Sequence, residues 1–207
     1  RLVFVGIKDV NFNFSDVIAT HGPGLIPYVS VKEAIGDLPS LFSKESASRY
    51  NKPASCEYQK LMRSKSRKFD CHIAPNHPAN TIEKIKSTKP GQPMYPRFKQ
   101  RIRLSWDIQS PTQVSGGIRP QFQFGHPSDP RGLTVRERCR IQSFPDDFVV
   151  KGGTVQGRVQ TGNAVPPALK PTIFVLILDS QSFLSLVAFL IFFVYFIGSG
   201  LINLFFL

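Results

Sequence analysis

A cysteine flanked by two arginines is the group in this sequence that could most directly do covalent chemistry. Cys139 stands in the stretch RGLTVRERCRIQSFPDDF, residues Arg131 to Phe148. A thiolate is a nucleophile, and nearby guanidinium groups lower the pKa of a thiol, so the stretch could be an active site. The same arginines could instead grip nucleic-acid phosphates or form a structural clamp. The surrounding residues have to decide among these three interpretations.

The stretch carries its own helix signals. Thr134 and Glu137 have the T-x-x-E spacing of a capping box, in which each side chain accepts the other residue's backbone N–H. The helix that follows is expected to be short, because Pro145 forces Phe144 out of helical geometry. An aspartate turn follows at Asp146.

Three arginines occupy this short helix, at Arg136, Arg138 and Arg140. At this spacing they cannot all lie on one face of a helix. We therefore expect some of them to pair internally with Glu137 or Asp146.

The chain as a whole is basic, with 26 Lys and Arg against 14 Asp and Glu and a formal net charge of +12. Its 207 residues suffice for one ordinary domain or for a piece of a larger protein. A basic domain favours an anionic partner, with nucleic acid before an anionic membrane surface, although a solvated basic face is the alternative. The densest run, KLMRSKSRK, supplies five candidate phosphate contacts: Lys60, Arg63, Lys65, Arg67 and Lys68.

Three irregularly spaced cysteines, Cys56, Cys71 and Cys139, argue against a disulfide framework and for a reducing compartment. Cys71-His72 followed by His77 has no second C-x-x-C or H-x-x-x-H partner, so we expect no metal site. We also expect no signal peptide, because the chain opens on an arginine and an apolar run of only four residues.

The rest of the chain reads as short elements joined by proline-rich loops. The expected elements are a buried strand at Arg1 to Gly6, a helix at Lys32 to Ile35, a helix at Thr81 to Lys86, and strands at Arg101 to Trp106 and Gln121 to Phe124. Gly116 and Gly117 lie between the last two, as a flexible turn or a place of close approach to a ligand.

A second landmark is GRVQTGNAVPP, Gly157 to Pro167. Gly162-Asn163 predicts a tight turn, and the two prolines predict a rigid exit with a new helix beginning at Ala168.

In this order and spacing, the landmarks resemble the C-terminal part of the DNA (cytosine-5) methyltransferases. LTVRERCRIQSFPDDF is similar to motif IX of that family, RVQTGNAVPP is similar to motif X, and RLVFVG resembles the end of motif VIII. The resemblance covers residues 1–170. The positions of motif IX expected to have a structural role are Thr134, Arg136, Glu137, Gln142, Phe144 and Pro145.

The resemblance implies an α/β fold: part of a Rossmann-like, S-adenosylmethionine-dependent methyltransferase domain with an irregular, mixed target-recognition domain. Residues 1–24 would end the catalytic domain, 25–130 would form the target-recognition region, and 131–170 would return to the catalytic domain. In this family double-stranded DNA lies between the two domains, and the target cytosine is flipped out of the helix. A cysteine attacks its C6 and the activated C5 takes the methyl group.

The residues that this resemblance carries over are few. Arg1 matches an arginine of motif VIII that helps to hold the flipped cytosine. Gly162, Asn163, Ala164 and Val165 would border the S-adenosylmethionine pocket, and Gly116 and Gly117 could let a recognition loop enter a groove.

The family's nucleophile, however, stands in a Pro-Cys-Gln motif, and none of the three cysteines follows a proline. The glycine-rich donor loop and the Glu-Asn-Val motif are also absent, and in family order all of them precede motif VIII. We therefore expect a fragment that is inactive alone, in which Cys139 takes a helix position and no catalytic part. A non-catalytic DNA-binding module is the alternative. The resemblance places the protein in the nucleus of a eukaryote, or in the cytoplasm and nucleoid of a bacterium.

The end of the chain differs in character, because residues 171–207 contain no Lys or Arg and only Asp179 is acidic. An apolar run of this length could span a bilayer. A membrane-anchoring helix, a hydrophobic C-terminal helix buried in a larger assembly and an aberrant C-terminus all remain open, and the basic body favours the last.

Overall fold

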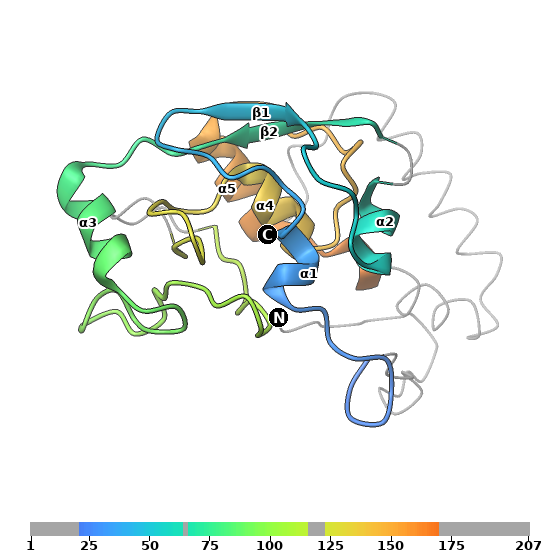
Figure 1. The fold of residues 1–207 in the computed structure, drawn as a ribbon, viewed down its shortest axis with the longest axis horizontal. Helices are drawn as coiled ribbons and strands as arrows, with labels where there is room; N and C mark the ends of the chain where they lie inside the picture. The colour runs from blue at the N-terminus through green and yellow to red at the C-terminus, as the bar shows by residue number, and fades with distance from the viewer. Residues whose placement is uncertain (1–20, 64–65, 116–122, 170–207) are drawn as a thin grey trace, which may run out of the picture. The chain divides into compact units, whose positions relative to one another are not determined.

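The computed structural model describes residues 21–63, 66–115 and 123–169, and residues 21–168 form one compact unit (Figure 1). The elements in chain order are α1 (Val31–Ile35), β1 (Ser46–Arg49), α2 (Glu57–Arg63), β2 (Lys68–Ile73), α3 (Ala79–Ser87), α4 (Val135–Ile141), α5 (Thr154–Asn163) and the 3₁₀ turn η2 (Pro167–Leu169). Several predictions lie outside the described residues: the strand at Arg1 to Gly6, the candidate contacts Lys65, Gly116 and Gly117, and the hydrophobic segment 171–207.

Three of the predicted helices are confirmed. The helix expected at Lys32 to Ile35 is α1, the one at Thr81 to Lys86 lies within α3, and the one after Thr134 is α4. Helix α1 also begins with a capping box, in which Ser30 and Glu33 each accept the other's backbone N–H. That box follows from the S-x-x-E spacing of Ser30 and Glu33, which the prediction of this helix does not include.

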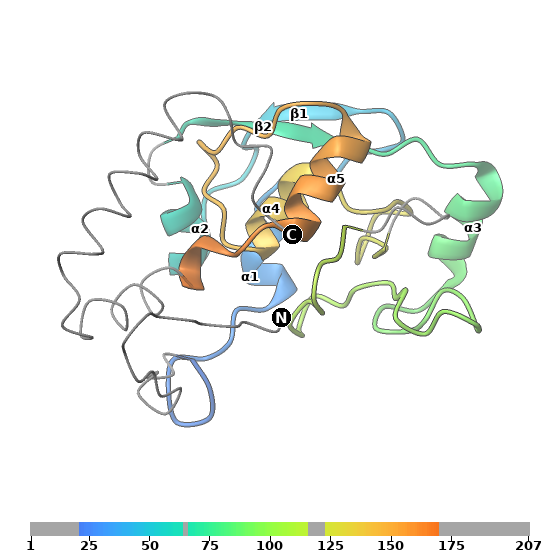
Figure 2. The same ribbon diagram turned by 180° about the vertical axis from the view of Figure 1, so that it is seen from behind.

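Strands β1 and β2 pair antiparallel in a two-stranded sheet that lies across α4 and α5 in both views (Figure 1, Figure 2). The register shifts between Ala47 and Arg49, and Cys71 has a positive φ of 61°. A bulge of this kind changes the face on which the following side chains lie. As a result Phe69 and His72, three positions apart, are both buried beneath the sheet.

The strand predicted at Arg101 to Trp106 is wrong as a regular strand, and the one predicted at Gln121 to Phe124 begins outside the described residues. Ile102 and Arg103 make single bridges, to Pro93 on one side and to Gly125 on the other. The backbone there is bonded on both sides, for example by Leu104 N–H to Gly125 O at 2.9 Å. On the side of Pro93 the ladder does not continue, because Pro90, Pro93 and Pro96 have no N–H to donate.

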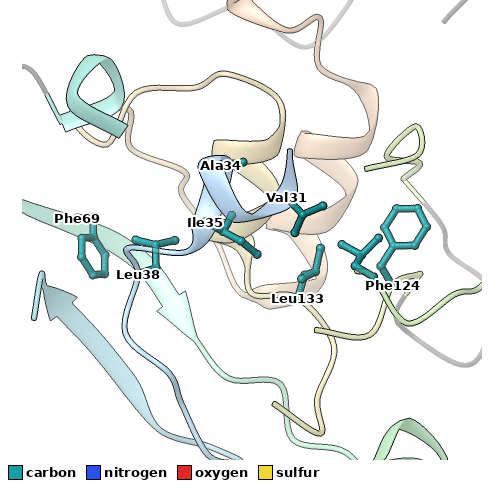
Figure 3. Packing of buried hydrophobic residues seen from close by; sticks show 8 residues of the cluster. Val31, Ala34, Ile35, Leu38, Phe69, Phe124 and Leu133 are labelled. Carbon is teal, nitrogen blue, oxygen red and sulfur yellow. The ribbon is translucent and has the colours of Figure 1, made fainter. Parts of the chain in front are cut away.

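The largest apolar cluster joins α1 and β2 to the segments that flank α4 (Figure 3). Its buried members are Val31, Ala34, Ile35, Leu38, Phe69, Leu104, Phe124 and Leu133. A second cluster, Val135, Cys139, Phe144 and Val150, lies on another side of α4. Helix α4 thus has apolar packing on two sides and contacts β2, α1 and α5.

The tight turn predicted at Gly162-Asn163 is wrong, because both residues belong to the last turn of α5. The helix predicted from Ala168 is, among the described residues, only the 3₁₀ turn Pro167–Leu169. Glycine is required at 162 for packing. A Cβ there would lie 2.1 Å from Ser115 N and 2.4 Å from Val114 C, so only glycine lets that backbone cross the helix.

We expect Gly162→Ala to lower the free energy of unfolding by about 3 kcal/mol, the upper end of overpacking penalties, because the clash is with backbone. Alanine's higher helix propensity would offset only about 1 kcal/mol of this. Chemical denaturation of both proteins measures the difference. Asn163→Ala is the matched control, since the neighbouring side chain is exposed. Equal stability of the G162A and N163A proteins would contradict the packing role.

Candidate nucleic-acid interface

Helix α4 is a charged helix that is buried on every side. Arg136 and Arg140 are fully buried, and Glu137 and Arg138 are no more than 2% exposed. Charged groups are excluded from protein interiors unless they are paired and hydrogen-bonded. Each of these side chains therefore has to find its acceptors or donors on a neighbouring segment.

Arg140 fixes α4 to the end of α1. Its guanidinium donates to both carboxylate oxygens of Asp146 at 2.7 Å, to the two oxygens of Asp37 at 3.1 and 3.2 Å, and to Ala34 O. The pairing expected with Asp146 is thus confirmed. Burial alone would lower the pKa of Arg140, but the two carboxylates outweigh it and raise that pKa.

Arg136 and Arg138 bind mainly to backbone and hydroxyl oxygens. Arg136 donates to Asp70 O of β2 and to Phe148 O, both at 2.8 Å, and lies 3.9 Å from Asp146. Arg138 reaches Thr161 Oγ1 of α5 at 2.9 Å and Val114 O at 2.8 Å. It has no carboxylate partner among the described residues, and burial lowers its pKa to about 10.

The capping box predicted at the start of α4 is confirmed. Glu137 N–H donates to Thr134 Oγ1 at 3.1 Å, and Thr134 N–H donates to Glu137 Oε2 at 2.7 Å. Glu137 also accepts two bonds, at 2.8 and 2.9 Å, from the buried Arg131, which is its ion-pair partner in place of the helix arginines. Burial would raise the pKa of Glu137, yet Arg131 holds it far below its usual range.

Two buried histidines flank this carboxylate in their neutral forms. Pro39 O can only accept, so His72 carries its proton on Nε2, 2.8 Å away, and its Nδ1 accepts from the Thr134 hydroxyl at 2.9 Å. His126 Nδ1 accepts from Asp129 N at 2.8 Å. Burial lowers the pKa of both rings, although Glu137 acts in the opposite direction.

The two segments that resemble motifs IX and X are in direct contact. Gln142 Nε2 donates to Thr161 O, and Ala168 N–H donates to Ser143 Oγ at 3.0 Å. Gly157 packs on Val135 so closely that a Cβ would lie 2.7 Å from that side chain. The α5 exit, which holds Gly162 and the exposed Asn163 and Val165, continues from this contact.

Of the candidate phosphate contacts, Arg67 and Lys68 are exposed at the start of β2. Arg49, which the sequence had not singled out, stands opposite Lys68 in the register of the sheet and is also exposed. We call these three residues the basic edge. Like charges at opposite positions repel, so this edge is suited to an anion.

The other two described candidates have partners in the chain itself. Lys60 lies 2.6 Å from Glu57 on the exposed side of α2. Arg63 donates to Asp37 at 2.7 Å and stacks its guanidinium 3.7 Å from the centre of the Tyr50 ring. Arg63 therefore has a structural role that its position in a basic run does not indicate.

The cysteines and histidines that could act as nucleophiles or metal ligands contact different parts of the chain and form no common site. Burial raises the pKa of Cys139 to about 11, so that its sulfur is a thiol at neutral pH. Cys71 Sγ lies 3.1 Å from Val150 O, and His77 Nε2 accepts from Gly132 N. Within the described residues no group of three or more His, Cys, Asp or Glu could hold a metal ion.

No helix in the described residues is long and apolar enough to cross a membrane.

Comparison with known proteins places the whole of this unit in one family. The family model of the C-5 cytosine-specific DNA methylases matches residues 1–178. The chain belongs to the C-5 cytosine-specific DNA methylases. The match includes both segments that meet at α4 and α5, so the buried arginine helix is part of a methylase domain.

Relatives of this methylase chain are type II methyltransferases. M1.HphI of Haemophilus parahaemolyticus is 32% identical in an alignment of 183 residues that covers 84% of this chain and 41% of that protein. M.NgoFVII of Neisseria gonorrhoeae is 32% identical in an alignment of 177 residues that covers 81% of this chain and 42% of that protein. The chain thus spans less than half the length of these relatives.

A solved structure shares the fold. It is described as a DNA modification methyltransferase encoded within a prophage of E. coli, with a TM-score of 0.61 and 18% identity. The similarity covers 83% of this methylase chain and 51% of that one. The described part of the methylase chain is accordingly a mixed α/β unit with a small sheet.

Replacing Arg140 with methionine should lower the free energy of unfolding by about 3–5 kcal/mol, because the buried Asp37 and Asp146 would each lose their hydrogen-bonded ion pair with Arg140. Denaturant titration measures the loss. The control is Lys60→Met, which breaks the exposed pair with Glu57 and should leave the unfolding midpoint unchanged. Two variants of equal stability would contradict a structural role for the buried arginine.

The neutral histidines predict a loss of stability in acid. A lowered pKa in the folded state means that the unfolded chain binds more protons below about pH 6.5, so the free energy of unfolding falls as the pH decreases from there. Burial, with Arg158 and Arg131, lowers the pKa of His77 to about 4, which sets its window.

The variant His77→Gln keeps an acceptor for Gly132 N–H but has no titrating ring. Between about pH 4 and 6.5 it should therefore reduce the slope of the unfolding free energy against pH by about 1.4 kcal/mol per pH unit, the contribution of one proton. Unfolding at a series of pH values measures the slope. The same slope in the wild type and the variant would show that His77 is not held neutral.

Proposed function

We propose that this chain is the C-terminal, target-recognition part of a DNA (cytosine-5) methyltransferase, an enzyme that transfers a methyl group from S-adenosylmethionine to C5 of cytosine in double-stranded DNA. The observation that carries the proposal is the family match over residues 1–178 in a chain that spans about two fifths of its relatives. In this reading residues 131–170 include motifs IX and X, and residues 25–130 form the recognition region.

Helix α4 acts in this proposal as the brace between the two regions. Arg140 binds Asp37 and Ala34 O on the recognition side, whereas Arg138 binds Thr161 on the motif X side. A recognition surface has to be held at a fixed angle to the reacting base, because small displacements greatly reduce the rate of a positioned reaction. Motif IX would identify the family without touching the substrate.

The basic edge would hold the DNA backbone. Arg49, Arg67 and Lys68 are exposed together at one end of the β1–β2 pair, and Lys60 is exposed on α2. Contacts to phosphate position a protein on DNA without reading its sequence. Which base pairs are read would depend on the rest of the recognition region.

The cofactor would lie next to the exit of α5. S-adenosylmethionine supplies an electrophilic methyl group, and it presents both polar groups and an apolar adenine face to its protein site. Asn163 and Val165 are exposed there, one with an amide and one with an apolar side chain, and Ala164 lies between them in extended backbone. These types suit one border of such a pocket; Gly162 is turned to the Val114–Ser115 backbone instead.

The chain's own cysteines do not fit the attack on C6 of cytosine. That step needs a thiolate, and Cys139 is fully buried with a raised pKa. Neither Cys56 nor Cys71 follows a proline. We therefore propose that the 207-residue chain binds DNA but transfers no methyl group by itself. The protein would act wherever its DNA is, in the nucleus of a eukaryote or the cytoplasm and nucleoid of a bacterium.

A non-catalytic DNA-binding module is the second candidate, and the buried thiol of Cys139 is the observation that favours it. The two functions differ in what the chain binds. A methyltransferase part that borders the donor pocket should alter S-adenosylmethionine binding when it joins the rest of an enzyme, whereas a module should act on DNA alone.

We expect the 207-residue chain to bind duplex DNA in gel-shift titrations and to transfer no tritiated methyl group from S-adenosylmethionine. The variant Arg67→Gln/Lys68→Gln should flatten the dependence of log affinity on log salt by about 1.8, because each lost phosphate contact removes about 0.9. The control Lys89→Gln removes an exposed charge from the end of α3. Methyl transfer by the chain alone, or equal slopes for all variants, would contradict the proposal.

A further inference from the structure

Arg158, in the middle of α5, is the exception among the buried arginines. Its side chain is only 9% exposed, yet its guanidinium donates to no acceptor among the residues that the structure describes. Every other buried arginine of the described residues has several acceptors: Arg103, Arg131, Arg136, Arg138 and Arg140. Arg103, equally exposed, illustrates the difference, because four backbone carbonyls accept from it.

Among the described residues, no carboxylate compensates the buried charge of Arg158. Burial accordingly lowers its pKa. Its charge in turn adds to the effect of burial in lowering the pKa values of Arg138 and His77. The Arg138 guanidinium lies 3.4 Å from the backbone carbonyl oxygen of Arg158, so two buried arginines without a carboxylate partner meet where α4 and α5 pack together.

Such an arrangement costs stability unless something else completes it. A guanidinium carries five donors in a planar fork, and those of Arg158 are partly desolvated without a protein acceptor, although none is fully sealed from solvent. Residues that lower stability without a structural partner are typical of binding sites. Because no nitrogen of Arg158 is both sealed from solvent and unpaired, an external acceptor can still reach it.

The missing acceptor has identifiable chemistry. Two adjacent cations in a poorly solvated site favour an oxyanion, and the planar fork of arginine matches phosphate in a bidentate manner. His77 does not compete for it as a charged group, since its pKa of about 4 keeps it neutral and its Nε2 accepts from Gly132 N.

We propose that Arg158 is the receptor for one phosphate of the DNA backbone, held at the junction of α4 and α5 and apart from the basic edge. This inference rests on the proposed function for the identity of the anion. It adds to that function a contact made by the motif X helix itself, so that DNA binding and the packing of α5 on α4 involve the same helix.

The test compares Arg158→Met with the wild type in the full 207-residue chain. Methionine fills a similar volume without unpaired donors, so the melting temperature should stay the same or rise. DNA affinity should fall on the order of tenfold at 50 mM salt, and the salt slope should be about 0.9 less steep, the effect of one phosphate. Arg158→Lys should keep the slope, because it keeps the charge.

Two further variants separate the alternatives. Arg138→Met removes bonds to Thr161 and Val114 and should lower the melting temperature. Lys32→Gln removes an exposed charge from α1 and should change the salt slope far less than R158M does. A melting temperature of R158M that falls as far as that of R138M, with an unchanged salt slope, would make Arg158 a structural residue and overturn the inference.

Inorganic phosphate distinguishes failure of this inference from failure of the proposed function. Phosphate should raise the melting temperature of the wild type clearly more than that of R158M, which keeps only the basic edge, whether or not the chain binds DNA. If the wild type binds no DNA but shows this Arg158-dependent shift, the anion site stands and the DNA-binding proposal falls. If phosphate has the same effect on both proteins and R158M binds DNA as the wild type does, the site at Arg158 is excluded.

Discussion

The structure depends on burying the charged side chains of one short helix. Helix α4 places Arg136, Arg138 and Arg140 among three different neighbours, and none of the three can be left without acceptors in the interior. Satisfying Arg140 requires the end of α1, satisfying Arg136 requires β2, and satisfying Arg138 requires α5. The positions of these elements around α4 follow from that requirement. Apolar packing alone would fix them less specifically, because it is not directional.

Local signals in the sequence predicted the local parts of this arrangement. The capping box at Thr134 and Glu137 needs only a spacing of three residues, and the pairing of Arg140 with Asp146 needs a spacing of six. Asp37 could not be found in this way, because it meets Arg140 across 103 positions. The same limit explains Arg63, whose place in a basic run suggests phosphate, whereas its partner Asp37 lies 26 positions earlier.

The errors in the fold have a similar origin. Gly162-Asn163 looks like a turn by residue type, but the glycine serves a crossing of two backbones that are distant in sequence. Residues 101 to 104 are bonded on two sides as a strand would be, yet the prolines on one of those sides prevent a ladder there. For the candidate interface, charge density identified Arg67 and Lys68. Arg49 is identified only by its position opposite Lys68 in the strand register. Arg158 is identified only because its buried side chain has no acceptor in the described residues.

Native-state hydrogen exchange tests most directly whether α4 holds the proposed recognition region and α5 together. If the buried arginines couple them, the slowest amides of β2, α4 and α5 should exchange with one common free energy, equal to that of global unfolding. Exchange of the α5 amides at a clearly lower free energy than those of α4 and β2 would show that α5 opens on its own. That result would contradict the account of α4 as the brace of this methylase unit.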